Sequence, residues 1–355
     1  MGRGKTDFFP INLILRREGE HNLISGELIW ETARLLLYLV GLIGFAAFNA
    51  AYLSLLERKE PAWFQLRHGP TEVGPMGLLQ PVADGIKLLG KQLMVQGGVD
   101  ELLFKIAPIA VVIPAIMCLV LIPFSENLGA RDINLGLLAV YSFAAITVLA
   151  TMLGGWASHN KYSSIAAARV VAQNIAYEIP LLLIIIALVM ATRTFDLREI
   201  VAQQAGGFWH WNVLRFTASP LMPVAFLIYF ICMLAESNRA PFDMIEAESE
   251  LIAGAFTEYS GMGFGLFFIA EYVNVVVGSA IGVIIFLGGW HCPLGLLPGL
   301  HWFLIKLYLL CFVVIWVRWT FPRTQFYGLL NLSWKVLIPV SLAHLVLTAV
   351  TVKLF

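Results

Sequence analysis

Charged residues are scarce in this sequence. They make up 13% of its 355 residues, whereas hydrophobic residues make up 59%. A soluble globular domain cannot cover so much apolar surface with so few polar groups, so the composition excludes that class and predicts a polytopic membrane protein. The 23 basic and 23 acidic residues balance, and no basic tract occurs, which argues against nucleic acid as a partner.

The sequence also lacks the motifs of metal and nucleotide sites. Its four cysteines are Cys118, Cys232, Cys292 and Cys311; they form no C-x-x-C pair, and the seven histidines show no metal-ligand spacing. We therefore expect no zinc site and no iron–sulfur cluster on this chain. Glycines 261, 263 and 265 open an apolar run instead of following a strand, so they do not predict a dinucleotide site. We expect no redox centre and no covalently bound cofactor.

Long apolar runs dominate what is present. An α-helix needs roughly 20 residues to cross about 30 Å of hydrocarbon. Eight segments satisfy this length, at approximately 33–56, 102–123, 136–157, 170–191, 216–235, 264–287, 300–319 and 334–354. We predict an all-α protein with about eight transmembrane helices, forming one domain over residues 31–355 after an N-terminal extension, 1–30. Basic residues divide evenly between the two sets of loops, so charge bias does not orient the chain.

Acidic residues are concentrated in the stretch 235–272, where Arg239 is the one basic residue. The seven acids are Glu236, Asp243, Glu246, Glu248, Glu250, Glu258 and Glu271. Because an ionised carboxylate is costly beside hydrocarbon, such groups bind protons, pair with cations, or do both. Pro241 is a suitable first helical residue, and a helix from there places Asp243, Glu246 and Glu250 on one face. That acidic face suits proton transfer, and the sequence also leaves open that it is a docking surface for a basic partner.

Two further ionisable residues fall inside apolar segments. The uninterrupted apolar run 179–191 has thirteen residues, so the fourth helix must extend back over Asn174, Tyr177 and Glu178 to cross. For Glu178 we favour a functional role over passive stabilisation by neighbouring polar groups. For Lys306 a functional role and simple snorkelling to the membrane surface stay equally open.

The first long loop, 57–100, is predicted to be ordered. Mixed charge and Pro61 indicate the end of the first helix, and a Gly- and Pro-rich turn region follows. From Pro81 a short amphipathic helix is predicted, with Asp84, Lys87 and Lys91 on one face and apolar residues towards the other. This pattern fits a helix lying along the membrane surface, and also an ordinary surface helix. The segment 154–169 is predicted to be a loop with aromatic residues at the membrane interface.

Several long strings in these regions resemble one known family, the quinone-binding membrane subunit of respiratory complex I that is called NADH dehydrogenase subunit 1 in mitochondria. The resemblance covers nearly all of residues 30–353. It rests on the strings ERK at 57–59, R-x-GP with VGP at 67–75, LQPxADxxKLxxK at 79–91, GWASxNKYS at 155–163, AQxxxYE at 172–178 and the stretch 235–272.

The resemblance implies a function and a set of site residues. The chain would be a membrane subunit of a proton-pumping NADH:quinone oxidoreductase, forming the chamber for ubiquinone or menaquinone. Residues of the quinone chamber would be Glu57, Arg58, Arg67, Asp84, Lys87, Arg239, Phe242 and Asp243. Proton-relay residues would be Glu178, Glu236, Glu246, Glu248, Glu250, Glu258 and Glu271.

The resemblance also implies partners and a location. Flavin and iron–sulfur clusters would be on partner subunits, which include hydrophilic quinone-site subunits and small membrane-arm subunits. The chain would span the bacterial cytoplasmic membrane, or an equivalent energy-transducing inner membrane, with loops after odd-numbered spans facing the cytoplasm or matrix. The sequence departs from the family pattern at Thr71, Gln92 and His159, and over residues 325–328.

Alternative functions stay open at this point. Within the same class, the chain could serve a related complex fed by ferredoxin, reduced deazaflavin or hydrogen. A self-contained proton-coupled transporter would also place acids in membrane helices, although such proteins usually contain inverted repeats, and none is visible here. A structural anchor for a soluble enzyme arm would explain the acidic stretch as a docking surface.

Overall fold

The computed structural model describes residues 17–130, 133–216, 219–245, 254–295 and 297–354, with side chains described from Trp30 onward. Residue contacts divide the chain into two units, 1–44 and 45–355. The described part of the first unit is helical and belongs to helix α1 (Arg17–Phe64), whose last turns open the second unit. The predicted boundary at residue 30 falls inside this helix, and the division into an extension and one domain stays a prediction.

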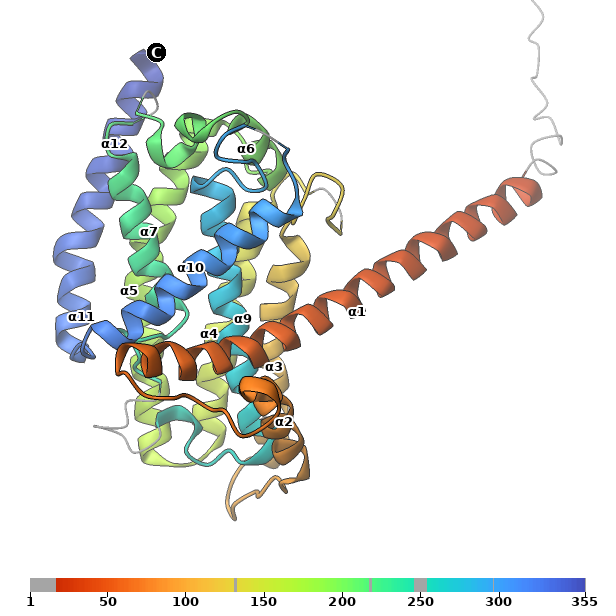
Figure 1. Ribbon diagram of the computed structural model, residues 1–355, viewed down its shortest axis with the longest axis vertical. Coiled ribbons are helices and arrows are strands. Elements are labelled where there is room, and N and C mark those ends of the chain that lie inside the picture. The colour runs from red at the N-terminus through yellow and green to blue at the C-terminus, as the bar shows by residue number, and fades with distance from the viewer. Residues whose placement is uncertain (1–16, 131–132, 217–218, 246–253, 296, 355) are drawn as a thin grey trace, which may run out of the picture. The chain divides into compact units, whose positions relative to one another are not determined.

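The second unit is a bundle of helices (Figure 1). After α1 its longer elements are α2 (Gln80–Gly90), α3 (Glu101–Leu121), α4 (Gly136–Ala157), α5 (Lys161–Thr192), α6 (Leu197–Gln203), α7 (Met222–Glu236), α9 (Gly261–Phe286), α10 (Leu300–Thr320), α11 (Phe326–Leu332) and α12 (Ile338–Leu354). Short 3-10 turns cover Pro75–Gly77 (η2), Phe208–His210 (η3), Asn212–Leu214 (η4) and Gly254–Phe256 (η5), and a π-helical turn, η6 (Ser333–Leu337), joins α11 to α12. Across the described residues, strand pairing is limited to one isolated bridge, so the all-α prediction is confirmed.

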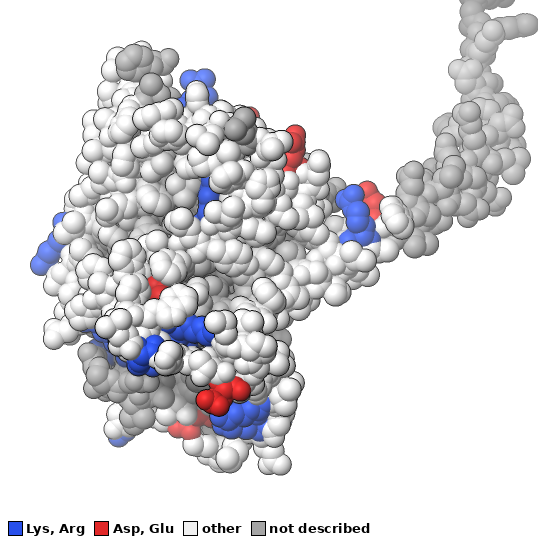
Figure 2. Space-filling view, in the orientation of Figure 1, with Lys and Arg blue, Asp and Glu red and all other residues white. Residues whose placement is uncertain are grey.

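Helix α5 packs against α4, α7 and α12. Helix α3 packs against α4 and α9, and α9 also contacts α7 and α10. Figure 1 shows α10 running obliquely across the bundle. On the face shown in Figure 2, uncharged residues cover most of the bundle, as expected for helices that face lipid.

Among the described residues, seven helices are long and apolar enough to cross a membrane. They coincide with seven of the eight predicted segments. The predicted segment 216–235 falls mainly on α7, which has only 15 residues. At 1.5 Å per residue, α7 spans roughly 22 Å, so it is shorter than the hydrocarbon layer.

Two predicted helix boundaries are wrong. Pro61 does not end α1, because its missing N–H removes only one hydrogen bond; the helix continues to Phe64, and Gln65 N donates to Pro61 O at 2.9 Å. The segment 154–169 is mostly helical and leaves only three residues between α4 and α5. The cause is a cap: Asn160 Oδ1 accepts a hydrogen bond from Tyr162 N at 3.0 Å and starts α5 early. The extended α5 includes Asn174, Tyr177 and Glu178, as predicted.

The helix predicted from Pro241 does not begin there. Residues 241–245 form turns after a cis Ala240–Pro241 peptide bond, because Phe242 N bonds to Arg239 O at 2.9 Å and Asp243 turns towards Arg323. The remainder of the predicted acidic helix, including Glu246, Glu248 and Glu250, lies outside the described residues.

The amphipathic helix of the first loop is confirmed as α2. Its Val82, Ile86 and Leu89 side chains are exposed, and its orientation along a membrane surface stays a prediction. Helix α2 packs against α9 at Gly265, where an added Cβ would lie 3.1 Å from Leu88 Cδ1. The small residue therefore allows α2 to approach α9 closely.

Candidate functional site

A largely buried group of three charged side chains and one tyrosine connects four segments that are distant in the sequence. Glu57 comes from α1, Arg239 from the turn after α7, Tyr272 from α9 and Arg318 from α10. Tyr272 Oη donates to Glu57 Oε2 at 2.5 Å, Arg239 Nη1 lies 3.2 Å from the same oxygen, and Arg318 Nη1 forms an ion pair with Glu57 Oε1. We call these four residues the Glu57 cluster.

Arg239 connects this cluster to a second buried acid. Its Nη2 atom lies 3.8 Å from Glu271 Oε2, and its guanidinium carbon lies 4.2 Å from the centre of the Tyr272 ring. Glu57, Arg239 and Glu271 are each 5–8% exposed. Charges this deeply buried are stable only when they are paired and hydrogen-bonded, and removal of one partner leaves the other uncompensated. The arrangement therefore holds α1, α9 and α10 together around one arginine.

The turn that carries Arg239 is fixed from α5. Gln173 Nε2 donates to Ala235 O and to Phe242 O, both at 2.8 Å, so one side chain bonds to the backbone on both sides of the turn. The Phe242 ring packs 5.4 Å from the Tyr177 ring. From the other side, Thr324 N donates to Pro241 O at 2.9 Å, and Arg323 pairs with Asp243 at 3.3 Å. Phe242 therefore supports the turn, and Asp243 faces Arg323.

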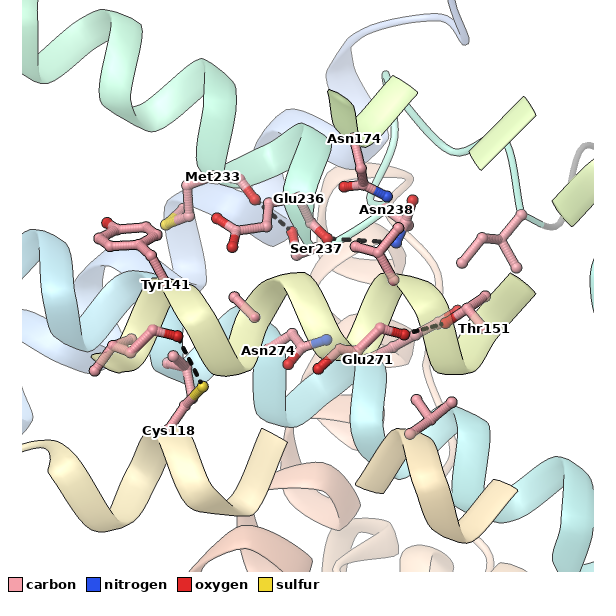
Figure 3. Close-up of a pocket in the computed structure, with 18 of the residues that line it drawn as sticks. Cys118, Tyr141, Thr151, Asn174, Met233, Glu236, Ser237, Asn238, Glu271 and Asn274 are labelled. Carbon is pink, nitrogen blue, oxygen red and sulfur yellow. Dashed lines mark hydrogen bonds between the residues drawn. The ribbon is translucent and has the colours of Figure 1, made fainter. Parts of the chain in front are cut away.

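A cavity with both polar and apolar lining residues lies beside Glu271 (Figure 3). It lies between α3, α4, α5, α7 and α9. Its polar lining residues include Tyr141, Thr147, Thr151, Asn174, Tyr229, Glu236, Ser237, Asn238, Glu271 and Asn274. Figure 3 shows Glu236 at the end of α7 and Glu271 on α9 on opposite sides of this space. Two carboxyl groups with several hydroxyl and amide neighbours make a cavity that suits ordered water and proton transfer.

Glu178 lines a smaller neighbouring cavity. Glu236, Asn174 and Tyr141 line both cavities, so Glu236 stands between Glu178 on one side and Glu271 on the other. Glu178, Glu236 and Glu271 thus line two adjoining cavities, and Glu271 pairs with Arg239, which also pairs with Glu57. Glu178 is half-buried and not in bulk solvent.

A third pocket adjoins the Glu57 cluster. Leu53, Val275, Val314 and Ile315 supply its apolar lining, and Glu57, Arg239, Tyr272 and Arg318 supply the polar side. Apolar walls with a few convergent polar groups are typical of small-molecule sites.

The remaining predicted quinone residues lie nearer the surface. Arg58 Nη1 pairs with Asp84 Oδ2 at 2.8 Å, which connects α1 to α2, and Lys59 bonds to the Met76 carbonyl. Arg67 is exposed and contacts Gln65, and Lys87 is exposed on α2. The structure therefore does not bring Arg67 or Lys87 into the buried cluster.

Glu258 has a different environment from the other predicted relay acids. Asn160 Nδ2 donates to its Oε1 atom at 2.6 Å, and Gln96 donates to its Oε2 atom. It does not line the described cavities that contain Glu236 and Glu271. These contacts show a carboxylate that joins three loops, at 96, 160 and 258. Burial raises the pKa of neighbouring Tyr259, so its hydroxyl stays protonated.

Lys306 does not snorkel. The residue is 7% exposed, and its ammonium donates to the carbonyl oxygens of Leu287, Gly289 and His291 at 2.6, 2.9 and 2.7 Å. Three donors and three acceptors satisfy the ammonium fully, so Lys306 closes the loop after α9. Burial, together with the Lys306 charge, lowers the pKa of His291 in that loop.

Sequence reasoning missed Arg318 and the pairing role of Arg323. Arg318 was detectable, because a basic residue near the end of an apolar helix is subject to the same rule that singled out Glu178. In the described part of the chain, no group of three His, Cys, Asp or Glu side chains is placed to hold a metal ion.

The chain matches known proteins over most of its length. A sequence model of the family described as NADH dehydrogenase matches residues 37–349. The chain belongs to this family. A protein of Desulfotalea psychrophila, named as a subunit of NADH-quinone oxidoreductase, is 57% identical over 88% of this chain and 95% of its own length.

More distant relatives have the same name. The protein of Dehalococcoides mccartyi is 43% identical over 89% of this chain and 86% of its own length. That of Carboxydothermus hydrogenoformans is 40% identical over 92% of each chain. Family membership extends over the Glu57 cluster and both acidic cavities, since all of these residues fall within 37–349.

Proposed function

We propose that this chain is a membrane subunit of a proton-pumping NADH:quinone oxidoreductase, forming the membrane side of its quinone chamber. The observation that supports this most strongly is the shared position of Arg239. It pairs with Glu57 beside an apolar-walled pocket, and it faces Glu271, which lines the cavity shown in Figure 3. Arg239 thus connects a pocket suited to an apolar quinone to a set of buried carboxyl groups.

The residues that line the pocket beside the Glu57 cluster suit a quinone headgroup chemically. Leu53, Val275, Val314 and Ile315 can contact the apolar parts of such a molecule, and Arg239, Arg318 and Tyr272 can act as hydrogen-bond donors towards its oxygens. The quinone accepts electrons and protons, with the electrons supplied by partner subunits. The flavin and the iron–sulfur clusters that deliver these electrons belong to those partners, which include hydrophilic quinone-site subunits.

The chain's own residues then respond to charge at the pocket. Added negative charge competes with Glu57 for the two arginines, so Glu57 and Glu271 bind protons more readily. A proton bound at Glu271 changes the field at Glu236 across the cavity and, in turn, at Glu178. This route conveys the redox event towards the proton-pumping arm as a coupling between sites. Glu246, Glu248, Glu250 and Glu258 remain proposed members of the relay.

The location follows from the same assignment. The end of α1 and the turn with Arg239 lie together, because Arg239 pairs with Glu57. The loop with Arg323 joins this turn through Asp243, and Arg58 pairs with Asp84 to connect α2 to the end of α1. We assign this end to the cytoplasmic side of a bacterial cytoplasmic membrane, where the hydrophilic arm docks. The transmembrane domain is assigned to residues 31–355.

A photoactivatable quinone tests this function on the assembled complex. The probe is expected to label this chain near the Glu57 cluster, and excess quinone should compete. Arg239→Gln should reduce labelling, whereas Arg193→Gln, at an exposed position, should not. Labelling that is absent from this chain, or that is equal in both variants, would contradict the assignment of the chamber.

A further inference from the structure

Glu60 is buried without a partner. The residue is 0% exposed, and neither of its carboxylate oxygens has a hydrogen bond in the described part of the chain. The described residues also give it no ion pair. This sets Glu60 apart from Glu57, which receives two arginines and a tyrosine hydroxyl.

Glu60 lies close to the Glu57 cluster because both residues are on α1. Three residues apart on a helix, their Cβ atoms are about 5–6 Å apart on the same face. Pro61 follows directly and has no N–H to donate to the Glu57 backbone carbonyl oxygen. This carbonyl oxygen therefore lacks its usual helical donor and can accept another hydrogen bond. Both side chains are buried, at 0% and 7% exposure, so neither carboxyl group is in contact with bulk solvent.

The environments of the two acids favour opposite protonation states. An ionised carboxylate without cation or donor is strongly disfavoured in a buried position, so Glu60 holds its proton. Glu57 is stabilised as an anion by Arg239 and Arg318. The other charged groups around this region, Glu271 and Arg239, pair with each other. A neutral acid beside an ion-paired one is a pattern found where protons are exchanged.

The geometry points to Glu60 as a proton-holding site that exchanges with Glu57, an inference that rests on the proposed function. When Glu57 loses part of its arginine pairing, a proton moves from the Glu60 carboxyl oxygen to a Glu57 carboxylate oxygen. Glu57 becomes neutral and Glu60 becomes the carboxylate; the reverse step restores both groups. No electron moves, and only the O–H bond changes. Glu60 thus adds a fifth ionisable side chain to the four residues of the cluster.

Infrared difference spectroscopy of the assembled complex tests this exchange, comparing the oxidised with the NADH-reduced complex. Wild type should show a protonated-carboxyl band that changes on reduction. Glu60→Gln should lose this band. Glu101→Gln is the matched control, because Glu101 is an exposed helix glutamate paired with Lys105, and it should keep the band. Glu60→Asp, which preserves the carboxyl group, should shift the band and not remove it. This variant provides the test if Glu60→Gln does not assemble.

The outcomes separate this inference from the proposed function. Spectra of Glu60→Gln or Glu60→Asp identical to wild type, in a complex that still reduces quinone and pumps, would overturn the role of Glu60 and leave the proposed function intact. A wild-type complex containing this chain that does not reduce quinone would contradict the proposed function itself.

Discussion

The hydroxyl of Tyr272 on α9 donates a 2.5 Å hydrogen bond to the Glu57 carboxylate on α1. The two residues are 215 positions apart in the sequence, and both are buried. The same carboxylate receives Arg239 and Arg318. Glu57 is therefore the point at which α1, α9, α10 and the turn after α7 meet, and variants around it test how the site works.

Tyr272→Phe should weaken the site without unfolding the chain. The change removes one hydroxyl and retains the ring that packs against Arg239. A hydrogen bond to a charged group contributes about 1.5–3 kcal/mol, so quinone reduction should fall roughly tenfold or more if the bond supports turnover. The rate is measured in the assembled complex with a water-soluble quinone. A rate equal to wild type would show that Glu57 is held by its arginines alone.

Arg318→Gln should destabilise the complex as well as slow it. Removing one partner of a buried ion pair costs about 3–5 kcal/mol, because the remaining charge is uncompensated. Arg318→Lys keeps the charge and should recover part of the loss. Thermal unfolding of the isolated complex gives the readout. The prediction is wrong if the Arg318→Gln and Arg318→Lys complexes unfold at the same temperature.

Two glycines in the first loop form a matched pair. Gly77 has φ +73°, and a Cβ there would lie 2.1 Å from the Pro70 carbonyl oxygen, whereas a Cβ at Gly85 meets no described atom within 4 Å. Gly77→Ala should therefore distort the loop, costing about 1 kcal/mol or more, and lower quinone reduction. Gly85→Ala, inside α2, should stabilise the helix by roughly 0.5–1 kcal/mol. Similar rates of quinone reduction in the two variants would show that the conformation of this loop does not affect quinone reduction.

His291 predicts a pH dependence of stability. Burial and the Lys306 ammonium lower its folded-state pKa below the unfolded value of about 6.5. The unfolded chain then binds more protons, so the contribution is complete above pH 6.5 and decreases as the pH falls through that value towards the folded pKa. When the pH is lowered from 8 to 5, the unfolding temperature should decline less in His291→Gln than in wild type. If the unfolding temperatures of both proteins change equally with pH, His291 does not cause the pH dependence.

The sequence was sufficient to predict the helical class and several members of the site. Glu178 and Glu271 were singled out because an ionisable group inside an apolar segment is rarely passive, whereas Arg239 was singled out by the family resemblance. The length requirement of a membrane helix correctly extended α5 over Asn174 and Glu178. These predictions depend on local composition and on helix length, which a single sequence contains.

Other features depend on contacts between distant segments. The Gln173 hydrogen bonds that close the turn at 235–242, and the pairing of Arg323 with Asp243, replaced the helix predicted from Pro241. Asn160 capping moved the start of α5. Glu60 was counted with the mixed charge at the end of α1, because nothing in its neighbours indicates that its side chain is fully enclosed.

The account depends on Glu236 and Glu271 conveying charge from the Glu57 cluster, and proton pumping by the Glu236→Gln complex tests this most directly. Protons moved and NADH oxidised are measured together in sealed vesicles, with Glu126→Gln as a control outside the described cavities lined by Glu236. The account predicts an assembled Glu236→Gln complex in which quinone reduction and pumping fall together. Wild-type rates with a wild-type proton-to-electron ratio would contradict it.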